Sequence, residues 1–223
     1  MRVLAIPDQH HPWASKAALA WTVAVARELK PDAIVNLGDA LDLYSLSRYP
    51  RSHNLYTPAE EFKRGMAGYR AHWAELQKVA PKARCIIIDS NHGDRLKKSI
   101  ARVLPEVESL IGNPFAVDGV EEHERIVLEG ALYEHGFRSK PEEHAKQNLQ
   151  STVHGHLHSA TLHRFNLAGR SRFNLNCGWL GDDGAPVFRY RQGAVSYWTL
   201  ACGVIRDGEP ELKVFPYSKR RAA

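Results

Sequence analysis

Three histidines alternate in the short stretch His154-Gly155-His156-Leu157-His158. The β-branched residues just before it predict an extended backbone, in which alternate side chains point to the same face. Imidazoles crowded on one face repel one another once protonated. A metal ion would give a folded protein a reason to keep them, because neutral imidazole is the commonest metal ligand. The alternative is a histidine-rich surface turn, so the metal hypothesis depends on partner ligands elsewhere in the chain.

Polar side chains able to bind a metal follow four other predicted strand segments. Residues 2–6, 33–37 and 84–88 are short apolar runs typical of buried parallel strands, and residues 124–133 predict one or two more strands. Because the carboxyl ends of parallel strands meet at one edge of a sheet, the residues just beyond them are expected to lie close together. For Asp8 the alternative is a simple Asx turn. Together with the first stretch, the candidate metal ligands are Asp8, His10, Asp39, Asn91, His135, His156 and His158.

The segments between the first strands predict the helices that place these strand ends. Ser15 is a typical helix N-cap, and residues 16–30 have the apolar spacing of an amphipathic helix. Residues 57–79 show a second and longer helical pattern with an aromatic stripe. A strand–helix–strand unit of this length predicts a parallel pair joined by a right-handed crossover.

The last third of the chain has a different pattern. Residues 162–216 alternate in β fashion, including the runs 187–190 and 195–200, and glycine and aspartate turns separate the runs. The basic tail, residues 219–221, is expected to be disordered. Because the chain has no repeats and no linker, the sequence predicts one domain over residues 1–223.

Side chains that suit a phosphate-bearing substrate lie next to the candidate ligands. His92 directly follows Asn91 and can exchange a proton, and Arg95 could meet a phosphate or merely face solvent. Tyr44 and Arg48 belong to a segment rich in aromatics, hydroxyls and cations. That mixture is typical of a phosphate site and nearly as typical of a solvated loop. Arg95, Tyr44 and Arg48 are therefore candidate substrate-binding residues.

Simpler roles are expected for three other polar side chains. Asp42 stands where a helix is predicted to open, and we interpret it as the cap of that helix. His123 lies in an acidic segment and His144 in a predicted helix after Pro141, so both are interpreted as surface residues.

Composition agrees with a soluble globular protein that handles phosphate. The 223 residues are 43% hydrophobic and 25% charged, with a formal net charge of +5 and a pI near 9.1. No apolar run approaches the roughly 18 residues of a membrane helix, and no secretory signal is recognised. The three cysteines lie far apart, which predicts reduced thiols and a cytoplasmic location. A mildly basic charge is compatible with a phosphate-bearing partner.

The order and spacing of these motifs resemble the calcineurin-like metallophosphoesterase family. The chain looks most like its phage and bacterial branch, often labelled phosphoesterase or DNA-repair exonuclease. The resemblance extends from the start of the chain to residue 158. It implies a four-layer αββα sandwich, in which two mixed β-sheets are flanked by helices and a dinuclear metal site lies at the strand ends. The matching motifs are Asp8-x-His10, Gly38-Asp39-x-x-Asp42, Asn91-His92, His135-Gly136 and Gly155-His156-x-His158.

The resemblance also implies how the ligands divide between two divalent ions. One ion would be held by Asp8, His10, Asp39 and His158, and the other by Asp39, Asn91, His135 and His156. Asp39 would then bridge ions roughly 3.5–4 Å apart, a metal-bridging hydroxide would attack phosphorus, and His92 would serve the leaving oxygen. Asp39 and His92 are accordingly the expected catalytic residues. Mixed imidazole, carboxylate and amide donors suit manganese, iron, zinc, nickel or cobalt alike, and availability decides among them. Manganese is taken as the first choice, and magnesium is also considered.

Two departures from the family pattern surround His92. The family usually has glycine before the Asn-His pair, where this chain has Ser90, and an acidic residue after it, where this chain has Gly93. Serine tolerates a positive φ less well than glycine, which leaves the geometry of this loop open. His154 has no counterpart in the family pattern. We expect it either to support a metal ligand without binding the metal itself or to lie on the surface.

The sequence therefore predicts a metal-dependent phosphoric ester hydrolase. A phosphodiesterase or nuclease is favoured by the basic charge and by the Tyr- and Arg-rich residues 44–51. The alternatives are a small-molecule phosphomonoesterase and a non-catalytic metal-binding scaffold with the same fold. The expected partner is a phosphate ester, with nucleic acid among the substrates considered and no membrane. The expected location is the cytoplasm of a bacterium or of a phage-infected host cell.

Overall fold

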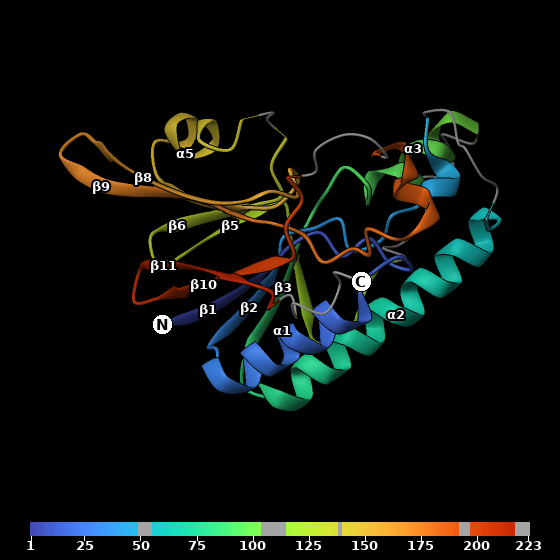
Figure 1. The fold of residues 1–223 in the computed structure, drawn as a ribbon, viewed down its shortest axis with the longest axis horizontal. Coiled ribbons are helices and arrows are strands. Elements are labelled where there is room, and N and C mark those ends of the chain that lie inside the picture. The colour runs from blue at the N-terminus through green and yellow to red at the C-terminus, as the bar shows by residue number, and fades with distance from the viewer. Residues whose placement is uncertain (49–54, 104–114, 138–139, 192–196, 217–223) are drawn as a thin grey trace, which may run out of the picture.

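Two mixed β-sheets pack face to face, with helices on both outer faces (Figure 1). Helices α1 (Lys16–Leu29) and α2 (Pro58–Val79) cover the first sheet, and the short α5 (Glu143–Asn148) lies on the second. This arrangement confirms the predicted four-layer αββα sandwich. The computed structural model describes residues 1–48, 55–103, 115–137, 140–191 and 197–216.

The first sheet has the order β11-β10-β1-β2-β3-β4. Strands β1 to β4 are parallel to one another, whereas β10 runs antiparallel to β1 and β11 antiparallel to β10. The carboxyl ends of β1, β2 and β3 therefore open at one edge, as predicted. The strands are β1 (Arg2–Ile6), β2 (Ala33–Asn36), β3 (Arg84–Ile88), β4 (Val120–His123), β10 (Ala201–Arg206) and β11 (Glu209–Val214).

The second sheet has the order β5-β6-β7-β9-β8. Its central strands β6, β7 and β9 are parallel, and the edge strands β5 and β8 are antiparallel to their neighbours. The carboxyl ends of β6 and β7 thus bring their following loops together. The strands are β5 (Arg125–Leu128), β6 (Ala131–Glu134), β7 (Ser151–His154), β8 (Ala160–Leu167) and β9 (Arg170–Cys177).

The two faces of the first sheet bury different cores, as the two-residue period of a strand requires. On β1, Leu4 and Ile6 pack against α1 and α2, where Trp73 is among the fully buried side chains. Val3 and Ala5 point the opposite way and pack in the core between the two sheets. A strand with apolar side chains on both faces reads as a continuous apolar run, which is why β1 was recognisable in the sequence.

Capping explains where the two long helices begin. The Ser15 side chain accepts a hydrogen bond from the Ala18 amide at 3.4 Å, at the start of α1. Thr57 and Glu60 form a reciprocal capping box at the start of α2, with Pro58 in the first turn. Both starts agree with the predicted helices, and each long helix consequently has a defined position on the sheet.

The structure corrects the sequence prediction in three segments. Residues 187–190, predicted as a strand, lie in the 3-10 helix η2 (Pro186–Arg191), because Val187 and Phe188 pack beside Trp179 rather than at a sheet edge. The described part of the predicted strand at 195–200 belongs to no named strand. The helix predicted after Asp42 is only the 3-10 turn η1 (Tyr44–Leu46).

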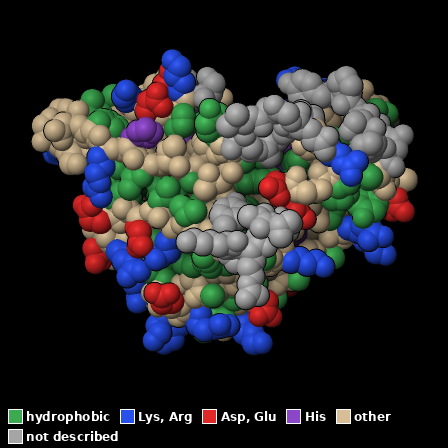
Figure 2. Space-filling view, viewed as in Figure 1, with side chains coloured by type: hydrophobic (Ala, Val, Ile, Leu, Met, Phe, Trp, Pro, Cys, Tyr) green, Lys and Arg blue, Asp and Glu red, His purple; other side chains and the backbone are tan. Residues whose placement is uncertain are grey.

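Parts of three predicted segments lie outside the described residues. They are the tail at 219–221, residues 49–51 of the Tyr- and Arg-rich segment, and residues 195–196 of the predicted strand. Charged side chains of both signs are intermixed along the edge formed by α1 and α2 in Figure 2, so the positive net charge does not form one basic face there. Within the described part of the chain, no helix is both long and apolar enough to cross a membrane.

Candidate metal centre

The loops that follow five strands meet at one end of the sheets, and backbone hydrogen bonds hold them together. The amide groups of Gln9 and His10, just beyond β1, donate to the Asp39 carbonyl beyond β2 at 3.1 and 2.9 Å. In the second sheet, the Gly155 amide donates to the His135 carbonyl at 3.1 Å. The structure thus brings the predicted ligands of both sheets into one place, at the edge near α3 (Asp94–Val103).

Left-handed backbone conformations are concentrated at these loops. Such conformations are uncommon for residues other than glycine, and they cluster at functional sites. They turn the chain sharply, so that short loops can direct their side chains inward. The predicted ligands with positive φ are His10 (54°), Asp39 (46°), His156 (71°) and His158 (59°).

One group of potential ligand atoms belongs to Asp8, His10 and His158, whose atoms lie within 4.8 Å of one another. The Nε2 atoms of His10 and His158 are 3.0 Å apart, and Asp8 Oδ1 lies 3.8 Å from His158 Nε2. Asp8 is fully buried, and both of its oxygens accept from the His156 amide at 3.0 Å. This group corresponds to the first predicted ion site.

The second group belongs to Asp39, His135 and His156. His135 Nε2 lies 3.3 Å from Asp39 Oδ2 and 2.8 Å from Asn91 Oδ1, and His156 Nδ1 lies 3.1 Å from the same Asn91 oxygen. Asp39 also forms a group with His10 and His92, so its carboxylate stands between the two sites. Donor atoms that share an ion are about 3.0–3.5 Å apart when each bond is about 2.1 Å long, and these separations fit that spacing.

The hydrogen-bonding roles in the second group test whether a cation fits. His135 Nδ1 lies 2.8 Å from the Leu37 carbonyl, which can only accept, so the ring hydrogen is on Nδ1. The lone pair of Nε2 in the neutral ring then faces the oxygens of Asn91 and Asp39, which are also electron-pair donors. Such convergent lone pairs repel unless a proton or a metal ion lies among them. The donor set therefore fits a divalent cation.

The electrostatics of the cluster support the same conclusion. The pKa of Asp8 is raised to about 6, mainly by burial. The positive charge of His135 acts to lower this pKa, and the negative charge of Asp39 acts to raise it. Burial would lower the pKa of His135, but the carboxylates of Asp39 and Asp8 raise it to about 9. Burial would likewise raise the pKa of Asp39, but His135 and His92 hold it well below its usual range. Opposing shifts of this size mark a cluster in which a positive charge is strongly favoured.

Asp42 is not the helix cap that the sequence suggested. The turn η1 that follows it has no side-chain cap, and Asp42 is buried. Its carboxylate accepts from His10 Nδ1 at 2.9 Å, which directs His10 Nε2 toward the site. The cap interpretation failed because the partner of Asp42 lies 32 residues away in the chain, and the Gly38-Asp39-x-x-Asp42 motif was the signal that could have indicated it.

His92 lies against the cluster and is held on three sides. Its amide donates to Asp39 Oδ1 at 3.0 Å, and its Nδ1 lies 2.7 Å from the Asp42 carbonyl. Nε2 must then accept the hydrogen bond from Arg95 Nη2 at 2.9 Å. The pKa of His92 is lowered to about 4, mainly by burial. The carboxylates of Asp39 and Asp42 act to raise this pKa, and the neighbouring cations lower it again. The imidazole is therefore neutral at neutral pH.

His154 does not share a face with His156 and His158. Strand β7 ends at His154, and the positive φ of the next two histidines turns them toward the site instead. His154 is buried, accepts from Asn174 Nδ2 at 2.9 Å and stacks on His144 with ring centroids 4.1 Å apart. His144 is buried too, so its predicted surface position is wrong. His123, by contrast, is partly exposed beside Glu121.

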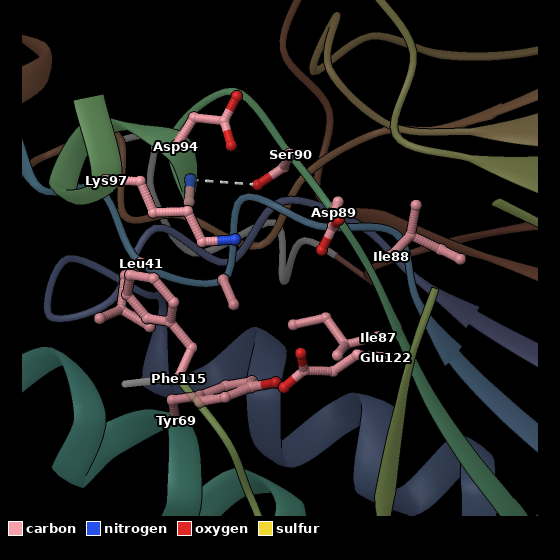
Figure 3. Close-up of a pocket in the computed structure, with 12 residues that line it drawn as sticks. Leu41, Tyr69, Ile87, Ile88, Asp89, Ser90, Asp94, Lys97, Phe115 and Glu122 are labelled. Atoms are coloured by element: carbon pink, nitrogen blue, oxygen red, sulfur yellow. Dashed lines mark hydrogen bonds between the residues drawn. The ribbon is translucent and has the colours of Figure 1, made fainter. Parts of the chain in front are cut away.

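The loop at Ser90 requires no left-handed residue, because neither Ser90 nor Gly93 has a positive φ. The Ser90 hydroxyl instead accepts from the Asp39 amide at 2.8 Å and from the Gly93 amide at 3.3 Å, so it ties the two loops together. Behind this loop lies a cavity of about 50 Å³, which Lys97 and Phe115 help to line (Figure 3). Ligand pockets in proteins usually measure about 300–1,000 Å³, so this cavity is too small for a substrate.

The candidate substrate-binding residues separate into two environments. Arg48 and Arg95 line a larger cavity of about 370 Å³, which also has Asn91 and His156 in its wall. Tyr44 packs against the hydrophobic cluster around Trp179 instead, and it is not among the residues that line this cavity.

The fold and the site together define a mixed α/β protein with a candidate metal centre at the strand ends. No protein-family model matches the chain. No curated protein matches its sequence.

Several solved structures are similar. Yfce, a phosphoesterase from E. coli, is 17% identical with a TM-score of 0.41 over 93% of this chain and 89% of its own. The nuclease MPE of Pseudomonas putida is 13% identical with a TM-score of 0.41 over 93% and 84%. Vps29 of Entamoeba histolytica, complexed with Zn²⁺, is 14% identical with a TM-score of 0.45 over 96% and 97%.

Proposed function

We propose that the chain is a two-metal phosphoesterase of the calcineurin-like metallophosphoesterase family, in its phage and bacterial branch, that hydrolyses phosphodiesters. The observation that supports this most strongly is the position of Asp39, whose carboxylate groups with His135 and His156 and also with His10, a member of the other ligand group. Asp8, His10 and His158 would hold one ion with Asp39. The second ion would be held by Asp39 together with Asn91, His135 and His156. Manganese is the first metal to test.

Divalent ions in these sites would neutralise charge on a phosphoryl group and generate a nucleophile from water. The protein side chains supply positioning. Asp42 orients His10, and Asp8 is fixed by the His156 amide, so the first ligand group is arranged before any substrate arrives. No serine or cysteine is needed as a nucleophile, and the three cysteines are all buried away from solvent.

His92 and Arg95 are the groups proposed to serve the leaving oxygen. The Arg95 guanidinium donates to His92 Nε2 and, at 2.7 Å, to the Asp42 carbonyl, so its position is defined. A guanidinium can neutralise charge on a departing oxygen. Once Arg95 turns to a phosphate, the unprotonated His92 Nε2 could take up the proton released by the attacking water and pass it to the leaving oxygen. We propose Arg95 and Arg48 as contacts to the substrate phosphate.

A second candidate function is a non-catalytic metal-binding scaffold. The observation that favours it is the hydrogen bond from Arg95 to His92 Nε2, because it occupies the only ring atom of His92 that could face a substrate. This reading predicts normal metal binding without turnover. A small-molecule phosphomonoesterase would use the same ligands and would differ in its preference for a monoester.

The direct test is hydrolysis of bis-p-nitrophenyl phosphate and of the aryl monoester by metal-stripped protein with Mn²⁺ added back. We expect faster turnover of the diester, and a loss of about 10²–10⁴-fold in His92→Ala. Asp39→Asn should lose turnover together with metal binding. His163→Ala, which changes an exposed histidine on β8, is the matched control. Two bound ions without turnover of either ester would refute the hydrolase and support the scaffold.

A cytoplasmic location and a single domain over residues 1–223 belong to this proposal. Three buried free thiols are compatible with a reducing compartment.

A further inference from the structure

The cavity of about 370 Å³ beside the second ligand group has a strongly cationic wall. Asn91 and His156 form the part of the wall that adjoins the metal centre. Among the described residues that line the cavity, none is acidic. The cationic side chains in the wall are Arg48, Arg95, Lys98 and Arg102. We call these four residues with Asn91 and His156 the cationic groove.

Helix α3 supplies three of the four cations from one face. Arg95, Lys98 and Arg102 follow one another at intervals of three and four residues, which places them on one side of a helix. The row spans roughly 10 Å at 1.5 Å per residue. Lys97 departs from this row and lines the small cavity behind the Ser90 loop instead (Figure 3).

The ion pair of Lys98 neutralises its charge only weakly. Lys98 lies 2.8 Å from Asp94, but both side chains are largely exposed, and an exposed pair of this kind opens easily. Arg102 is exposed at the end of the row. Arg95 is the innermost cation, where it contacts Asp42 and His92 at the edge of the metal centre. Positive charge therefore continues outward from the site along α3.

We propose that the cationic groove binds successive phosphates of a single-stranded nucleic acid, next to the phosphate held at the metal centre. This inference rests on the proposed function. A single phosphate would be neutralised by the metal centre and Arg95, which leaves the outer cations available to further phosphates that follow it. A row of cations suits the regular phosphates of a strand. Because Asp39 and His135 are buried, a flexible strand reaches them more easily than a rigid duplex does.

The test measures binding by fluorescence anisotropy of a labelled single-stranded DNA whose phosphorothioate linkages resist hydrolysis. The full-length, metal-loaded protein is compared with Lys98→Gln, Arg102→Gln and the double variant across a salt series. We expect the double variant to bind the strand at least about tenfold more weakly. The slope of the logarithm of the binding constant against the logarithm of the salt concentration should be shallower by roughly 1.4, or about 0.7 for each lost phosphate contact. Both side chains are exposed, so folding should persist, and thermal melting checks this.

The matched control is Lys97→Gln, which removes the same charge from the same helix but outside the groove. If Lys97→Gln and Arg102→Gln weaken strand binding equally, the cationic groove is not the binding site and the proposal is refuted. Unlabelled strand and inorganic triphosphate are also compared as competitors of the labelled strand. If triphosphate displaces the labelled strand equally well at equal phosphate concentration, the assignment to a nucleic acid is refuted.

The groove and the proposed function can fail separately. Turnover of bis-p-nitrophenyl phosphate without groove-dependent strand binding would refute the groove and leave the hydrolase standing. Groove-dependent strand binding without turnover of any ester would support the groove and refute the hydrolase.

Discussion

Replacing Gly155 with alanine tests the metal centre most directly. An added Cβ would press against Asp8 Oδ2 and lie 3.1 Å from Asp8 Cγ, whereas carbon atoms in ordinary contact are about 3.5–4.0 Å apart. Gly155 has no positive φ, so the alanine backbone is itself unstrained and the effect comes from this contact alone. Asp8 cannot move outward freely, because it is fully buried and both of its oxygens accept from the His156 amide.

The size of the effect follows from this confinement. Overpacking of this kind costs about 1–3 kcal/mol of stability. Metal sites tolerate ligand displacements of only about 0.5 Å, so the affinity of the ion bound by Asp8 should fall about 100-fold or more. One ion of two should be lost, because Asp8 belongs to only one ligand group.

Calorimetric titration of Mn²⁺ into chelator-treated protein measures both stoichiometry and affinity. Gly93→Ala is the matched control, because its Cβ would meet Ser90 O at an ordinary 3.4 Å and Gly93 also has no positive φ. Circular dichroism melting should show both variants folded. If Gly155→Ala binds two ions with the affinity of the wild type, Asp8 is not a ligand and the division into two sites is wrong.

Two further predictions concern the surroundings of the site. Asp42→Ala should weaken metal binding about 10–100-fold, because it removes the acceptor that orients His10, and an unchanged affinity by calorimetry would contradict that role. Burial lowers the pKa of His72 to about 4 in the folded protein. Between about pH 6.5 and 4, His72 therefore binds a proton in the unfolded chain but not in the folded one. The free energy of unfolding must consequently fall as the pH drops through that window. Urea unfolding should show a loss of about 2 kcal/mol from this group between pH 7 and pH 5, and the loss should be absent in His72→Gln. A pH dependence identical in wild type and His72→Gln would show that another group is responsible.

The neutral form of His72 is part of a buried hydrogen-bond chain that reaches the site. Asn36 accepts from the Gly38 amide and donates to Gln9, whose amide nitrogen is 2.5 Å from His72 Nδ1. His72 Nε2 then lies 3.0 Å from the Thr22 hydroxyl. Protonation of Nδ1 would break this chain, which gives the expected acid sensitivity a structural basis.

The sequence by itself determined the parallel strands β1, β2 and β3 of the first sheet and the residues at their ends. Residues 2–6 and 84–88 match β1 and β3, because a strand buried on both faces is a short apolar run bounded by polar residues. Parallel pairing then brings the strand ends together, so Asp8 and Asn91 could be expected in one site without coordinates. The Ser15 cap likewise located the start of the first long helix, and the helical pattern from residue 57 located the start of the second.

Only the tertiary structure decided how these side chains are held. Asp42, His144 and His154 were misread or left open because their partners come from other segments, and local spacing does not record those contacts. The sharp left-handed turns at the ligands depend on the same surroundings, since a residue adopts an unfavourable φ only when its neighbours fix it there. Local periodicity thus determined which residues could meet, and packing between distant segments decided which of them face the site.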